Sequence, residues 1–95
     1  MITLQTKVIP HSDVIATALS NQETVLLHMQ TQQYYTLNET GTQIWGGLVQ
    51  AHSLVDIGQT LEARYEITLE QAHQHILELI TMLAAEKLVQ VVGAV

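Results

Sequence analysis

Three short β-rich runs, separated by very short polar connections, constrain the fold of this chain more than any other feature. The runs are residues 14–19 (VIATAL), 24–29 (TVLLHM) and 32–37 (QQYYTL), and only residues 20–23 and 30–31 lie between them. Strands joined so closely pair as antiparallel neighbours, because a parallel crossover needs about a dozen residues or more. The sequence therefore predicts a three-stranded antiparallel meander. Residues 1–13 form either an extra strand or a loose N-terminal segment.

The rest of the chain predicts three helices, each preceded by a good N-cap residue. The first helix starts near Asn38 or Thr40, the second starts at Ser53, and the third starts at Thr68 and runs to about Glu86. Helical spacing directs these residues to the core: Ile44, Trp45, Leu48 and Val49; Leu54, Ile57, Leu61 and Tyr65; Leu69, Ala72, Ile76, Leu79, Ile80 and Leu83. The pair Gly46-Gly47 predicts a close backbone approach. Residues 88–95 end the chain as a short strand or an apolar tail.

Strands followed by helices predict an α+β fold, with the helices on one face of the sheet and an arrangement like that of a winged helix. With only 95 residues, we expect one domain over residues 1–95. Winged helices often bind DNA, but three Lys and Arg stand against nine Asp and Glu here. Phosphate recognition requires clustered cations. The sequence therefore predicts no nucleic-acid partner.

Several other classes of function are also disfavoured by composition. The chain has no Cys, which excludes disulfides, thiolate nucleophiles and Cys-type zinc sites. It has no run of transmembrane length and no signal-peptide pattern at its start, so we expect a cytoplasmic protein with no membrane partner.

No catalytic, cofactor-binding or metal-binding residue is predicted. His11, Ser12 and Asp13 are consecutive, whereas the members of a catalytic triad meet in space from separate places in the sequence. His73 and His75 are two positions apart, and a helical metal chelate needs a spacing of four. No Gly-rich phosphate loop is present. The sequence therefore predicts a protein that is not an enzyme and holds no cofactor.

The third helix presents two rims beside its core stripe. One rim contains His73, Leu77 and Ala84, and the other contains Ala72, His75, Leu79 and Met82. Met82 is the apolar residue that the core stripe does not explain. A thioether at the edge of an apolar stripe suits an adaptable peptide groove, which favours the second rim.

The segment YYTLNETGTQIW brings these observations together. An ordered set of residues resembles the PqqD-like family. The set is Leu26-Leu27 in a hairpin strand, Tyr34-Tyr35, Leu37-Asn38, then Gly41 and Ile44-Trp45. The closing Leu88-Val89 is similar too, so the resemblance covers about residues 8–90. Members of that family recognise peptides in the biosynthesis of ribosomally made, post-translationally modified peptides. His75 and Gly46-Gly47 depart from the family pattern.

The resemblance implies a non-catalytic module that binds the leader of a precursor peptide as an added strand. The implied partners are that leader and a leader peptidase or another modifying enzyme, and the motif looks closest to the free-standing partners of lasso-peptide biosynthesis. Main-chain hydrogen bonds would give affinity, and pockets for alternate side chains would give specificity. The residues expected to contact the peptide are Gln33, Tyr34, Tyr35, Thr36, Ala72, His75, Leu79 and Met82.

Two other functions are kept as alternatives. One is a winged-helix-like regulator that acts through protein or DNA contacts, since a fold does not choose a function. The other is a small enzyme or metal protein. The oligomeric state is open between a monomer and a dimer paired through a strand edge.

Overall fold

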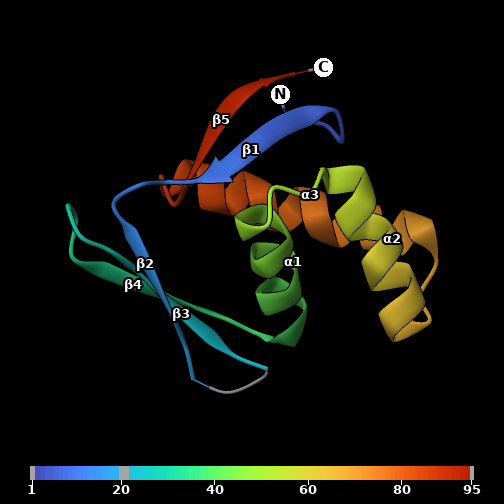
Figure 1. Ribbon diagram of the computed structural model, residues 1–95, viewed down its shortest axis with the longest axis horizontal. Helices are drawn as coiled ribbons and strands as arrows, with labels where there is room; N and C mark the ends of the chain where they lie inside the picture. The colour runs from blue at the N-terminus through green and yellow to red at the C-terminus, as the bar shows by residue number, and fades with distance from the viewer. Residues whose placement is uncertain (1, 20–21, 95) are drawn as a thin grey trace.

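The computed structural model describes residues 2–19 and 22–94 as five strands and three helices (Figure 1). In chain order they are β1 (Thr6–Pro10), β2 (Val14–Ala18), β3 (Thr24–His28), β4 (Gln33–Leu37), α1 (Glu39–Val49), α2 (Leu54–Tyr65), α3 (Leu69–Ala85) and β5 (Val89–Ala94). No helix in these residues is long and apolar enough to cross a membrane.

The predicted meander is confirmed. Strands β2, β3 and β4 form one antiparallel sheet in that order, and the three helices lie together on one side of it (Figure 1). Strand β3 lies at the centre and alternates strictly. It buries Thr24, Leu26 and His28 and leaves Val25 and Leu27 half-exposed on the outer face. The α+β prediction therefore holds, whereas the comparison with a winged helix is not confirmed by this arrangement.

A second sheet joins the two ends of the chain. Strand β1 pairs antiparallel with β5, from Pro10 opposite Val89 to Thr6 opposite Ala94, with a register shift between Lys7 and Val8. The N-terminal segment thus contains an extra strand from Thr6 onward, and residues 89–94 form a strand. The extra strand pairs with the C-terminal run and not with the meander. Residues 1 and 95 lie outside the described part of the chain.

The helix starts follow side-chain capping. Ser53 caps α2 by accepting a hydrogen bond from the Asp56 N–H at 3.1 Å, and Thr68 and Gln71 form a reciprocal capping box on α3. Helix α1 is capped by Asn38, whose Oδ1 accepts from the Gly41 N–H at 2.9 Å. Thr40 lies inside α1, so the expected alternative start there is wrong. Asn38 is therefore the single residue between the end of β4 and the start of α1.

The core is aliphatic around one tryptophan. Trp45 is only 5% exposed, as predicted. The buried hydrophobic residues are Val8, Leu26, Leu37, Ile44, Trp45, Leu48, Leu54, Ile57, Leu61, Ala72, Ile76, Ile80, Leu83, Leu88 and Val89. Two predicted core residues, Val49 and Leu69, are exposed, because each occupies the end position of its helix.

The predicted close approach at the glycine pair is confirmed for one of the two residues. A Cβ on Gly47 would lie 2.6 Å from Cγ1 of buried Ile57 on α2, whereas a Cβ on Gly46 would meet nothing within 4 Å. Gly47→Ala is therefore expected to destabilise the fold by about 1–3 kcal/mol through overpacking. Gly46→Ala is the matched control, and it is expected to stabilise α1 by up to about 1 kcal/mol. Urea unfolding of both variants tests this, and equal stabilisation by the two would contradict it.

Candidate functional site

Strand β4 has a strand neighbour on only one side within the described residues. Two hydrogen bonds, Leu19 N–H to Glu23 O at 3.0 Å and Met29 N–H to Asp13 O at 2.9 Å, show that odd-numbered residues of this hairpin bond across β2 and β3. In an antiparallel ladder these pairs alternate, so even-numbered residues of β3 bond to β4. Their partners are Gln33, Tyr35 and Leu37. The backbone N–H and C=O groups of Tyr34 and Thr36 therefore point to the open edge.

The side chains of β4 alternate as predicted. Leu37 is buried and Tyr35 half-buried on the inner face, whereas Tyr34, at 72% exposure, and Thr36 lie on the outer face. Leu37 anchors the strand in the core immediately before Asn38 begins α1. The edge of β4 is thus held at a fixed place beside the helices.

A hydrogen bond between residues 51 positions apart ties this edge to the end of α3. The Tyr35 hydroxyl donates to Glu86 Oε2 at 2.7 Å, or alternatively to Gln33 Oε1 at 2.9 Å, since it has one proton to give. The bond to the Glu86 carboxylate raises the pKa of Tyr35 above its ordinary value, and burial and the nearby negative charge raise it further. Sequence reasoning missed Glu86, because nothing in the local pattern pairs it with β4.

This pKa shift makes a testable prediction. The stabilisation from neutral Tyr35 should be fully present below the unfolded-state pKa of about 10, and it should be lost as the pH rises through the higher folded-state pKa. Glu86→Gln removes the acceptor charge and should lower the Tyr35 pKa. Ultraviolet titration of tyrosinate tests this, with Tyr35→Phe identifying which ionisation belongs to Tyr35. An unchanged Tyr35 titration in Glu86→Gln would contradict the assigned cause.

A hollow of about 330 Å³ opens between α3 and the start of α1, which directly follows β4. Three of the predicted contact residues, His75, Leu79 and Met82, line it from α3. The other residues around it are Asn38, Thr40, Gly41 and Ile44 from the start of α1, and Glu78 from α3. We call this hollow the α1–α3 pocket. Its lining combines apolar side chains with polar ones.

The remaining predicted residues take different places. Ala72 is completely buried in the core and does not line the α1–α3 pocket. His73, Leu77 and Ala84, which form the other rim of α3, do not line it either. Sequence reasoning missed the four α1 residues, although their position directly after the Tyr34-Tyr35 strand was a usable signal.

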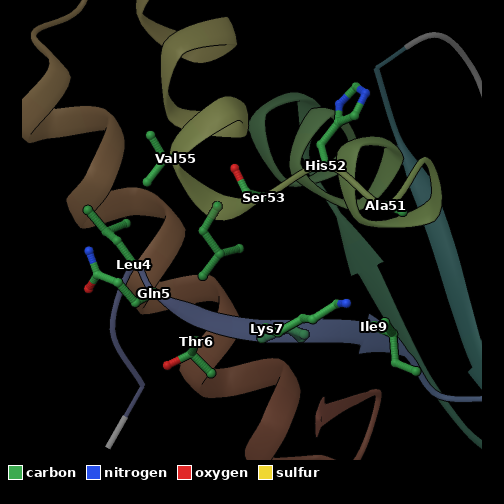
Figure 2. A pocket seen from close by; sticks show the side chains of 11 residues that line it. Leu4, Gln5, Thr6, Lys7, Ile9, Ala51, His52, Ser53 and Val55 are labelled. Atoms are coloured by element: carbon green, nitrogen blue, oxygen red, sulfur yellow. The ribbon is translucent and has the colours of Figure 1, made fainter. Parts of the chain in front are cut away.

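A second hollow, of about 390 Å³, lies between β1 and residues 51–55 (Figure 2). None of the predicted contact residues lines it. Figure 2 shows Lys7 lying along the strand and His52 pointing away from it, so these two polar side chains do not converge on one point. Among the described residues, no group of three or more His, Cys, Asp or Glu side chains is placed to hold a metal ion.

Comparisons with known proteins give one family and one fold. The profile of the family described as Coenzyme PQQ synthesis protein D (PqqD) matches residues 23–89. A solved structure of TbiB1 in complex with the TbiA(beta) leader peptide is 24% identical, with a TM-score of 0.82 over 86% of this chain and 94% of that chain. A lasso peptide synthetase B1 complexed with its leader peptide is 26% identical, with a TM-score of 0.80 over 88% and 98%. No curated protein matches significantly.

Proposed function

The chain belongs to the PqqD family, and we propose that it binds the leader region of a ribosomally made precursor peptide and delivers it to a modifying enzyme. The observation that carries the proposal is the open edge of β4, a strand that leads directly through Asn38 into the α1 residues that line the α1–α3 pocket. An extended leader segment would add as an antiparallel or parallel strand to this edge.

The backbone of β4 supports strand addition. Tyr34 and Thr36 each direct one N–H and one C=O group outward, which offers a peptide four hydrogen-bonding groups at the spacing of a sheet ladder. Main-chain bonds of this kind give affinity without reading sequence. Gln33 and Tyr35 hold the strand on β3, so their part is to present the edge.

The α1–α3 pocket supports selection of side chains. A strand added along β4 would direct every second side chain to the inner face, where Leu79 and Met82 offer apolar surface and His75 a polar rim. Met82 is exposed in the free protein, although it is apolar and lies on this pocket. An apolar leader residue covering it would remove both surfaces from water.

The class of peptide is proposed from the comparisons. One solved structure with the same fold and 26% identity is a lasso peptide synthetase B1 with a leader peptide. We therefore favour lasso-peptide biosynthesis, with a leader peptidase as the partner that receives the bound precursor, and a role for this chain without catalysis. The alternative of a regulator acting through protein or DNA contacts gains no support from these comparisons, and the net charge of −6 opposes contact with DNA.

Chemical-shift mapping tests the proposal. The probe is the synthetic leader of the cognate precursor peptide, titrated into the isotope-labelled protein, with a scrambled leader as control. Shifts are expected in Gln33–Thr36 and in His75, Leu79 and Met82. Shifts confined to His73, Leu77 and Ala84, with β4 silent, would reject both the strand addition and the pocket.

A further inference from the structure

The meander has a second open edge, on the side of β2 away from β4. Within the described residues β2 has only β3 as a strand neighbour. Since the odd-numbered residues of β2 bond to β3, the backbone groups of Val14, Ala16 and Ala18 point outward. The Val14 N–H already donates to His11 O at 3.1 Å. Ala16 and Ala18 therefore carry the outward N–H groups that remain for another strand.

Prolines, charged side chains and bulges often protect strand edges, and β2 has none of these three. Strand β1 has all three, with Pro10, Lys7 and a register shift after Lys7. Strand β2 has no proline and no charge, and its register with β3 is uninterrupted. It is thus a regular edge that can accept a further strand.

The side chains along β2 favour a second copy of this chain as the occupant. Ala16 and Ala18 are exposed and small, so another strand can approach closely from that side. On the outer face Ile15 is 46% exposed, and Leu19, just after the strand, is 60% exposed. With a net charge of −6, two copies repel each other over most of their surfaces. Strand β2 carries no charged side chain, so pairing through it brings no like charges of the strand together.

We propose that two copies pair antiparallel through β2, with the two-fold axis at Thr17. In this register Ala16 of each copy lies opposite Ala18 of the other copy. The outward N–H and C=O groups of both residues then form ladder hydrogen bonds. Ile15 then lies opposite the partner's Leu19 on the outer face, and the reverse. The two-fold symmetry thus covers Ile15 and Leu19 on both copies.

The register follows from the hydrogen bonds in the structure. An axis at Ala16 would place Val14, whose N–H is already used, opposite the partner's Ala18, and would leave Ile15 facing threonine. An axis at Thr17 avoids both defects. The resulting six-stranded sheet leaves β4 of each copy at its outer ends, so the dimer does not compete with a peptide on β4 and stands independently of the proposed function.

A single cysteine tests this geometry directly, because the natural chain has none. Residues at a non-hydrogen-bonded position on the axis have Cα atoms about 4.5 Å apart, within the range of a disulfide. Thr17→Cys should therefore convert to a covalent dimer under mild oxidation, with at least tenfold more product than Thr36→Cys. Thr36 is the matched control, since it is also an exposed threonine on the outer face of this sheet. Equal crosslinking by the two variants would overturn the proposal.

Sedimentation equilibrium of the uncrosslinked protein provides an independent test. The average mass of the wild type should rise with concentration from 10.6 kDa toward twice that value. Ala16→Pro should remain monomeric, because proline removes an outward N–H group that the dimer needs. The Ala16 N–H lies outside the β2–β3 ladder, so circular dichroism should show that the fold is intact. Thr36→Pro, on the other edge, should still dimerise. A wild type that stays monomeric throughout, or a dimer lost in Thr36→Pro but kept in Ala16→Pro, would overturn the proposal.

Charge exchange tests the register even if the proline variant does not fold. Ile15→Lys and Leu19→Glu should each weaken dimerisation at least tenfold. The double variant should recover most of the loss, because each lysine would then face a glutamate across the interface. Failure of the double variant to recover would reject the axis at Thr17.

Discussion

Trp45→Ala should lower the free energy of unfolding by about 3–5 kcal/mol, the largest stability loss expected from one substitution in this chain. Trp45 is its only tryptophan, lies on α1 and is almost completely buried within the hydrophobic core. Domains of this size are stable by about 5–15 kcal/mol, so much of the total would be lost. The Trp45 Nε1 is buried without a hydrogen-bond partner, so the stabilisation comes from packing.

Chemical denaturation followed by circular dichroism measures this loss. Trp45→Phe should lose less, because it keeps an aromatic ring in the core and removes an N–H that has no partner. Tyr34→Ala is the control for loss of an aromatic side chain, and its effect should stay within about 0.5 kcal/mol because Tyr34 is exposed. A Trp45→Ala protein as stable as the wild type that only fails to bind the leader would show that Trp45 is a contact residue.

The parts of the fold that local chemistry determines were predictable from sequence. Ser53 and Thr68 are the N-caps of α2 and α3, as their capping partners Asp56 and Gln71 indicate. The short polar connections between the strands predicted the meander that is observed. At α1 two cap residues competed, and Asn38 is the cap because Leu37, directly before it, is buried at the end of β4.

The long-range pairings were not predictable in the same way. Strand β1 is a mixed run that contains Thr6 and Lys7, whereas β5 is mostly apolar. No local feature of either run indicates that Thr6 pairs with Ala94, which is 88 positions away. The bond from Tyr35 to Glu86 is of the same kind. Such contacts depend on how the helices bring the two ends of the chain together.

The candidate site was predictable in part. The family motif and the unexplained Met82 selected the rim of α3 that lines the α1–α3 pocket together with the start of α1. Helical spacing alone also included Ala72, which lies one turn before Ile76 and packs into the core. Periodicity gives the side of a helix, but the depth of a position depends on the elements packed against it.

Met82→Glu should weaken leader binding at least 100-fold, or about 2.8 kcal/mol, with little change in fold stability. Met82 is 40% exposed in the free protein, so a carboxylate there stays in water until the peptide arrives. A leader side chain in the α1–α3 pocket would strip that water without providing a positive partner, which is costly for a charge. Leu79 lines the same pocket but is half-buried, so a charge there would also affect folding.

The matched control is Thr81→Glu, which adds the same charge at the neighbouring exposed position, on a part of α3 that does not line the pocket. It should bind the leader within about threefold of the wild type, since a surface charge that contacts nothing has an effect of roughly 0.5 kcal/mol or less. Met82→Leu should also bind nearly normally, because an apolar surface of similar volume remains. Fluorescence polarisation with a labelled leader measures all three variants. If Thr81→Glu and Met82→Glu weaken binding equally, the effect is one of net charge, and the α1–α3 pocket does not hold a leader side chain.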